Sequence, residues 1–257
     1  HTPGFGSAAK FIATSVLETY LDSSVYINNG IFILETMGRD TGWLASAAAL
    51  AQLNGKQVAD FIYLPETAFD IDKFLIDVKN KFEEQNQVYI VVSEGIRTAE
   101  GKFVAEAHAQ AHDKFGHAQL GGVGNYLKNL IISSGITSRV KSLELGVLQR
   151  CAMHCASNID IEEAYEVGYE ALRQASLGKC GYMIGIKRES NTPYKSSYFL
   201  IEADKVANNV KYFPTEWINE EGNNLKAEVL EYLSPLVSSV PSVISSLPMP
   251  VFKVFNK

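Results

Sequence analysis

Cysteine, long apolar runs and blocks of like charge are all scarce in this sequence of 257 residues. No apolar run approaches the roughly 20 residues that a membrane-spanning helix needs, so we expect no membrane association. The three cysteines are few and odd in number, which argues against a disulfide framework and favours a reducing compartment, the cytoplasm. The net charge of −6 includes no extended basic or acidic block, which argues against a nucleic-acid partner.

The remaining composition is that of a globular protein, with 46% apolar and 20% charged residues. Strand and helix patterns alternate along most of the chain, and helices of this length between strands indicate βαβ units. The sequence therefore predicts an α/β fold: a doubly wound, mostly parallel sheet with helices on both faces.

The elements behind this prediction follow from apolar spacing, capping residues and glycine stops. Three helical segments are 6–20, 41–53 and 122–133. A fourth helix is capped by Asp70 and continues to Phe82, and a fifth is capped by Asp160 and continues to Leu172. The strand segments are 31–34, 58–64, 88–92, 140–146 and a late pair at 182–186 and 197–201. After Pro235 we expect irregular structure or a terminal helix.

The segment from Ile31 to Leu53 carries the clearest functional signal. An apolar strand leads directly into Met37-Gly38-Arg39, and a helix of small residues follows. Backbone N–H groups and the helix dipole favour an anion at such a junction. Because the planar guanidinium of Arg39 suits phosphate, the pattern indicates a phosphorylated small molecule as ligand.

Two other strands end near a glycine and are followed by charged residues. Glu94 follows the strand 88–92, and Arg150 follows the strand 140–146, which also holds Lys141. Ligands of parallel sheets bind beyond the carboxyl ends of the strands, so these residues could share one cleft with Arg39. Alternatively, Glu94 caps a helix or forms a salt bridge, Lys141 lies on the surface, and Arg150 packs against a helix.

The cysteines invite a metal interpretation that their spacing does not support. Cys151 and Cys155 flank a histidine, but no second Cys/His pair follows, as a zinc site requires. Cys180 is too isolated to complete a site. Buried structural thiols at a helix start are the favoured interpretation.

Two other patterns have plain structural interpretations. His108, His112 and His117 lack the glutamate of the zinc-protease motif, so a solvated helix with two histidines is favoured. The glycines of 121–124 lack the spacing of a dinucleotide loop and favour a turn or close packing before a helix.

Taken together, five landmarks resemble the phosphofructokinase family, in the family's order. They are His1-Thr2-Pro3-Gly4-Phe5-Gly6-Ser7-Ala8, Met37-Gly38-Arg39, Leu64-Pro65-Glu66, Ser93-Glu94-Gly95 and Gly146-Val147-Leu148-Gln149-Arg150. The resemblance covers about 150 residues. It implies phosphoryl transfer to the 1-hydroxyl of fructose 6-phosphate, with Mg²⁺ and with pyrophosphate or ATP as donor.

The resemblance also implies roles for individual residues. The motif 37–39 contacts the sugar phosphate, Glu94 binds sugar hydroxyls, and Lys141 and Arg150 hold the 6-phosphate. Phosphoryl transfer depends on charge neutralisation, so a site rich in basic side chains fits this chemistry. The implied substrate-binding residues are Met37, Gly38, Arg39, Glu94, Lys141 and Arg150. A homo-oligomer, a dimer or tetramer, is also implied.

Departures from the family's pattern concern the donor and the catalytic base. Val147 stands where the ATP-dependent bacterial branch has His, and the segment 41–44 and the first eight residues are closer to the pyrophosphate-dependent branch. The family's donor loop and catalytic segment precede the stretch at His1, so we expect a partial chain with no catalytic residue and no Mg²⁺ ligand of its own. Alternatives are the ATP-dependent enzyme and a non-catalytic sugar-phosphate-binding or regulatory subunit.

Two domains are expected on the same basis. Residues 1–160 form the sugar-phosphate-binding α/β domain. Residues 161–257 form a C-terminal part that helps to complete the donor domain.

Overall fold

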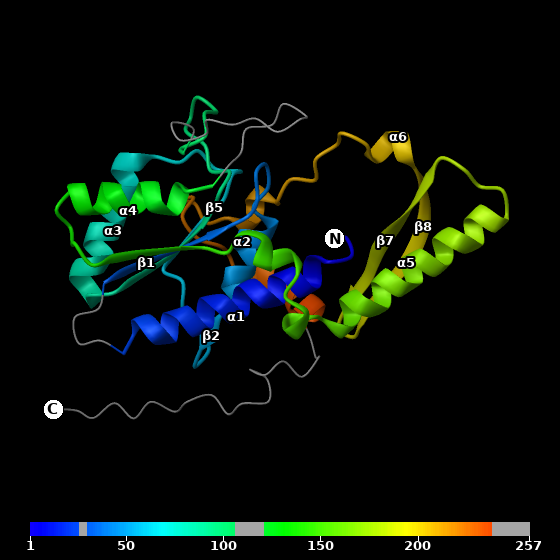
Figure 1. The fold of residues 1–257 in the computed structure, drawn as a ribbon, viewed down its shortest axis with the longest axis horizontal. Helices are drawn as coiled ribbons and strands as arrows, with labels where there is room; N and C mark the ends of the chain where they lie inside the picture. Colours follow the sequence, from blue (N-terminus) through cyan, green and yellow to red (C-terminus); the bar gives the residue numbers. More distant parts are fainter. Residues whose placement is uncertain (26–29, 106–120, 238–257) are drawn as a thin grey trace.

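A computed structural model describes residues 1–25, 30–105 and 121–237 of the chain (Figure 1). Its centre is a four-stranded parallel sheet in the order β4-β5-β1-β6. The strands are β1 (Ile31–Thr36), β4 (Phe61–Tyr63), β5 (Val88–Ser93) and β6 (Val140–Glu144). Every residue of β1 and β5 is buried, as expected for inner strands covered on both faces. The predicted parallel sheet is confirmed.

Helices cover both faces of this sheet, as predicted, because alternate strand residues point to opposite sides. Phe32 and Leu34 of β1 pack with α1 (Phe5–Ser23), α2 (Trp43–Ser46) and α7 (Glu228–Leu233). Ile31 and Ile33 pack on the other side with α3 (Ile71–Gln85) and α4 (Val123–Ser133). Figure 1 shows β1 between α4 on one side and α1 on the other. The Asp70 carboxylate caps α3 by accepting the Lys73 N–H, as predicted.

The predicted helix 41–53 is wrong in its second half. After α2 the chain forms a 3₁₀ turn, η1 (Ala47–Leu50), and then a hairpin of β2 (Gln52–Leu53) and β3 (Lys56–Gln57). Asn54 and Gly55 both have positive φ, which is the geometry of a tight two-residue hairpin turn. The chain therefore reverses direction at Asn54-Gly55, and the helix that the alanine-rich pattern predicts does not continue beyond η1.

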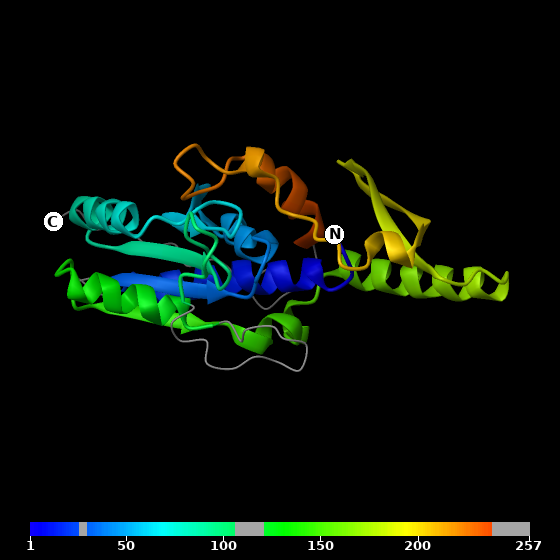
Figure 2. The ribbon, with the colours of Figure 1, turned by 90° about the horizontal axis from the view of Figure 1, so that it is seen from above.

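A second, smaller unit lies beside the sheet. It consists of α5 (Asn158–Ser176) and an antiparallel hairpin of β7 (Tyr182–Asn191) and β8 (Tyr194–Glu202), which confirms the late strand pair (Figures 1 and 2). The predicted capping role of Asp160 is wrong, because α5 begins after Ser157. Asp160 instead accepts the N–H groups of Gly4 (2.6 Å) and Ser7 (2.9 Å) and so caps α1.

Short elements complete the described part of the chain. They are η3 (Gly146–Arg150), η4 (Met153–Cys155), α6 (Ala203–Val206), η5 (Thr215–Trp217) and η6 (Ser234–Val237). The expectations for His108, His112, His117 and the tail beyond residue 237 lie outside the described residues. None of the helices within the described ranges has both the length and the apolarity to span a bilayer.

Candidate functional site

All four strands of the parallel sheet end at one edge, and one of the motifs singled out in the sequence follows each of them. Residues 37–39 follow β1, residues 94–95 follow β5, residues 145–150 follow β6, and Pro65 and Glu66 follow the segment that contains β4. Parallel strands deliver their carboxyl ends to the same side of a sheet, so motifs far apart in sequence become neighbours here.

The turns after β1 and β5 are in direct contact. The Gly38 N–H donates to Glu94 Oε1 (3.1 Å), and the Ser93 hydroxyl donates to the Gly38 carbonyl (2.6 Å). A Cβ on Gly95 would lie 2.0 Å from the Arg39 carbonyl oxygen, and one on Gly38 would lie 2.6 Å from Ser93 Oγ. Only glycine permits this close approach, which places the Glu94 carboxylate against the backbone of the Met-Gly-Arg turn.

The segment after β6 is joined to the same turn by Gln149. The Met37 N–H donates to Gln149 Oε1 (3.2 Å), and Gln149 Nε2 donates to the Gly146 carbonyl (3.0 Å). Gln149 is 3% exposed, whereas the adjacent Arg150 is exposed. Sequence reasoning gave Gln149 no role of its own, although it lies inside the motif that carries Arg150.

The Glu94 carboxylate lies within electrostatic reach of both Arg39 and Arg150. Burial raises the pKa of Glu94, and the Gly38 N–H and the positive charges of Arg39 and Arg150 oppose that rise. The nearby carboxylate of Glu144 adds to the rise. The two guanidinium groups therefore act on the same carboxylate from different strand ends.

Lys141 lies apart from these residues. It stands at the start of β6, opposite Phe32, and its ammonium is 3.7 Å from the Asp22 carboxylate at the surface. Since β6 runs parallel to β1, Lys141 lies at the amino end of the sheet, and Arg39 follows the carboxyl end. The expected approach of Lys141 and Arg150 to one charge does not occur, because they lie at opposite ends of the strand.

Two further contacts hold the edge together. Glu66 accepts the N–H of Gly42 (3.0 Å), at the start of α2, and the N–H of Phe213 (2.9 Å). The Arg97 guanidinium, four residues beyond Ser93, donates to Asp40 at 2.6 Å. Side-chain hydrogen bonds thus hold the segment after Arg39, through Gly42 and Asp40, and the segment after Glu94, through Arg97.

The expectation for the cysteines is only partly confirmed, whereas the expectation for the glycine segment 121–124 is confirmed. All three cysteines are free, and Cys155 is buried, but Cys151 and Cys180 are exposed, which corrects the expectation of buried thiols. The segment 121–124 is the turn that begins α4, as expected. In the described part of the chain, no cluster of three or more His, Cys, Asp or Glu side chains could hold a metal ion.

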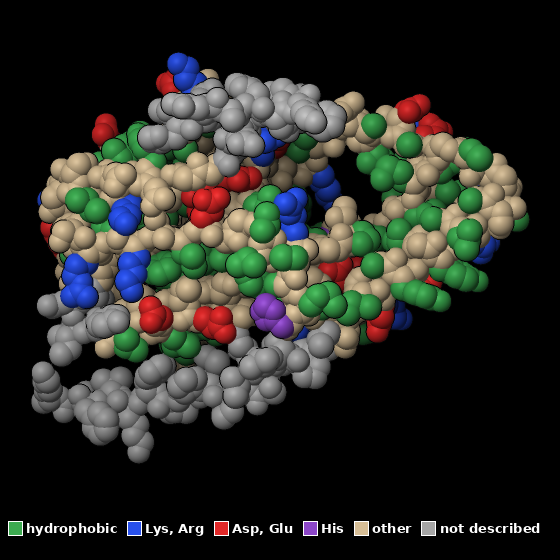
Figure 3. Space-filling model, in the orientation of Figure 1, with side chains coloured by type: hydrophobic (Ala, Val, Ile, Leu, Met, Phe, Trp, Pro, Cys, Tyr) green, Lys and Arg blue, Asp and Glu red, His purple; other side chains and the backbone are tan. Residues whose placement is uncertain are grey.

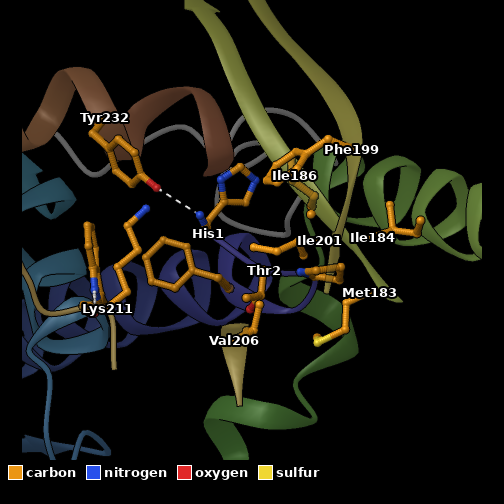
Figure 4. A pocket seen from close by; sticks show the side chains of 14 residues that line it. His1, Thr2, Met183, Ile184, Ile186, Phe199, Ile201, Val206, Lys211 and Tyr232 are labelled. Atoms are coloured by element: carbon orange, nitrogen blue, oxygen red, sulfur yellow. Dashed lines mark hydrogen bonds between the residues drawn. The ribbon is translucent and has the colours of Figure 1, made fainter. Parts of the chain in front are cut away.

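A separate apolar cavity of about 480 Å³ lies between the start of α1 and the β7–β8 hairpin (Figure 4). Figure 4 shows Tyr232 and Lys211 on one side, and Met183 and Phe199 among the hairpin side chains on the other. Neither the Met-Gly-Arg turn nor Glu94 lines this cavity, so it is distinct from the charged edge of the sheet.

Comparison with known proteins assigns this architecture to a family. The sequence pattern of the phosphofructokinases matches residues 1–175, and the motifs described above lie within that range. The chain belongs to the phosphofructokinase family. This phosphofructokinase-family chain is 40% identical over 237 residues to the pyrophosphate–fructose 6-phosphate 1-phosphotransferase of Methylococcus capsulatus. That match covers 91% of this chain and 56% of the relative, so the chain spans little more than half of its relative's length.

Other phosphofructokinases are similar in sequence or in structure. The crystal structure of a pyrophosphate-dependent phosphofructokinase from Nitrosospira multiformis superposes with a TM-score of 0.79 at 32% identity. The match covers 98% of this chain and 57% of the Nitrosospira chain. An ATP-dependent 6-phosphofructokinase of Nostoc is 33% identical, over 72% of this chain and 47% of that protein.

Proposed function

We propose that this chain is the fructose 6-phosphate-binding portion of a 6-phosphofructokinase that uses pyrophosphate to make fructose 1,6-bisphosphate. The observation that carries the proposal is the joint placement of Arg39, Glu94 and Arg150 at one sheet edge, in a chain of this family. Relatives named for the pyrophosphate reaction are 37–40% identical over more than nine-tenths of the chain, which favours this donor over ATP.

The proposed roles follow from charge. Arg39 and Arg150 offer planar guanidinium groups that pair with the two negative charges of a phosphate monoester. Glu94 is a hydrogen-bond acceptor that suits sugar hydroxyls. Met37 and Gly38 shape the turn that carries Arg39. Lys141 is left out of this set because it lies at the opposite end of β6.

We assign no catalytic base to the described residues, and no Mg²⁺ ligand either, since no cluster there suits a metal. We propose that both come from the part of the longer relatives that this chain does not match. Mg²⁺ would neutralise charge on the transferred phosphoryl group, and Arg39 and Arg150 would hold the acceptor sugar in place.

We further propose the division into a sugar-phosphate domain, residues 1–160, and a C-terminal part, residues 161–257, that partly completes the donor domain and also returns to the sheet, where α7 packs against β1. Helix α5 supports it with a line of exposed apolar side chains at helical spacing: Ile161, Tyr165, Tyr169 and Leu172 are 52%, 69%, 58% and 72% exposed. Figure 3 shows apolar side chains gathered on this unit. Exposed apolar surface of this kind marks a contact site, here for the unmatched part of the longer relatives.

The cellular compartment and the oligomeric state are also proposals. Three free thiols, two of them exposed, fit a reducing compartment, and we propose the cytoplasm. The family resemblance leads us to propose a homo-oligomer, either a dimer or a tetramer. We assign its subunit interface to no particular surface.

The proposal is tested by binding and turnover measured separately. Calorimetry on the 257-residue chain should detect fructose 6-phosphate binding and no binding of fructose. Phosphoryl transfer should be absent from this chain and present, with pyrophosphate, in a longer parent chain. Turnover with ATP alone would support the ATP-dependent alternative, and sugar-phosphate binding without turnover in any parent chain would support a regulatory subunit. Absence of sugar-phosphate binding would refute the proposed site.

A further inference from the structure

Glu35 is a buried carboxylate, 3% exposed, that lies on β1 two residues before Met37. Each of its oxygens accepts a backbone hydrogen bond from the start of α4. The Gly122 N–H donates to Oε1 (3.0 Å), and the Gly124 N–H donates to Oε2 (2.8 Å). We call this pair of hydrogen bonds the α4 clamp. It connects the strand that carries the Met-Gly-Arg turn to a helix 89 residues away in sequence.

The surroundings of Glu35 are acidic. The charged side chains in the described ranges that influence Glu35 are Glu144 on β6 and Glu94 after β5, while α4 contributes backbone N–H groups. Burial raises the pKa of Glu35 to about 7, the two carboxylates add to the rise, and the Gly124 and Gly122 N–H groups oppose it. Its ionisation therefore changes in the neutral range, next to the carboxylate of Glu94.

We propose that Glu35 is a positioning residue for the sugar-phosphate site, because its ionised carboxylate holds the start of α4 against the end of β1. This inference rests on the proposed function. An ionised carboxylate accepts at both oxygens, whereas protonation turns one of them into a hydroxyl and weakens the acceptance of one N–H. The same turn brings Gly121 against Glu144, since a Cβ there would lie 3.1 Å from Glu144 Oε1. Loss of the clamp therefore disturbs the turn that lies against Glu144, whose charge acts on Glu94.

The clamp is tested without substrate by NMR of chain labelled with ¹⁵N-glycine. We expect the amide shifts of Gly122 and Gly124 to titrate together with a midpoint near pH 7, and the Glu35→Gln variant to lose this titration. The matched control is Glu144→Gln, which keeps both hydrogen bonds and removes one like charge, so its midpoint should move to lower pH. Amides that do not titrate in the wild-type chain would overturn the inference.

The positioning role is tested by calorimetric titration with fructose 6-phosphate at pH 6 and pH 8. A phosphate monoester also ionises near pH 6, so wild type and Glu35→Gln are compared at each pH. We expect the variant to bind about tenfold more weakly than wild type at pH 8 and within about twofold at pH 6, where wild-type Glu35 is itself mostly protonated. An equal ratio at both pH values would overturn the positioning role and leave the proposed function intact. No binding by either protein at either pH would overturn the proposed function, and with it the role of Glu35.

Discussion

The side-chain oxygen of Gln149 accepts the backbone N–H of Met37 at 3.2 Å, across 112 residues of sequence. The two residues belong to different motifs of the family, one after β6 and one after β1. Their hydrogen bond joins the Met-Gly-Arg turn to the segment that ends in Arg150 at the carboxyl end of the sheet.

Replacing Gln149 by alanine should destabilise the fold by about 1–3 kcal/mol, because the Met37 N–H loses its buried acceptor. Urea unfolding followed by circular dichroism measures this change. Leu148→Ala is the matched control: Leu148 is 56% exposed in the same segment, and its loss should cost less than about 0.5 kcal/mol. Equal stability of both variants would show that the hydrogen bond contributes nothing measurable.

Replacing Arg39 by alanine should weaken fructose 6-phosphate binding by about 1.5–3 kcal/mol, the contribution of a charged hydrogen bond to phosphate. Calorimetry on folded protein measures the loss. Lys141→Ala removes a positive charge at the other end of the sheet and should leave the affinity nearly unchanged. If Lys141→Ala caused the larger loss, the phosphate would have to bind elsewhere.

Replacing Gly95 by alanine should cost about 1–3 kcal/mol of stability and weaken sugar-phosphate binding, because the new Cβ meets the Arg39 carbonyl oxygen at 2.0 Å. Gly168 of α5 is the control, since no atom lies within 4 Å of a Cβ there. Gly168→Ala should stabilise the chain by about 0.5–1 kcal/mol, because alanine loses less backbone entropy in a helix. Thermal unfolding of both variants measures the contrast, and a neutral Gly95→Ala would contradict the close approach.

The stability of wild type relative to Glu35→Gln should fall as the pH rises from about 4.5 to about 7. Because the folded pKa of Glu35 lies above its unfolded value, the folded chain binds more protons in this window, and that contribution is lost as the proton leaves. The shift from 4.5 to about 7 corresponds to about 3 kcal/mol. Urea unfolding at pH 5 and pH 8 measures it.

The comparison with the variant is needed because burial also raises the pKa values of Asp60, Glu66 and Glu94. These groups are present in both proteins and add the same trend to each. A difference in stability that does not change between pH 5 and pH 8 would show that Glu35 titrates at its ordinary value in the fold.

Much of the fold follows from local pattern. The continuous apolar runs of β1 and β5 predict inner parallel strands, and Asp70 predicts the start of α3. These signals depend on residues a few positions apart, so they survive without knowledge of the tertiary structure. The pattern failed at 41–53, where small residues fit a helix but the Asn54-Gly55 turn forms a hairpin.

What the sequence determined alone is most of the helices and strands, the α/β class and the order of motifs that indicates a phosphate ligand. Only the tertiary structure decided which polar groups meet. It paired Asp160 with the start of α1, placed Lys141 at the far end of the sheet, and gave Glu35 and Gln149 their backbone partners. The reason is physical: periodicity and capping act within a few residues, whereas these partners are set by the strand order β4-β5-β1-β6.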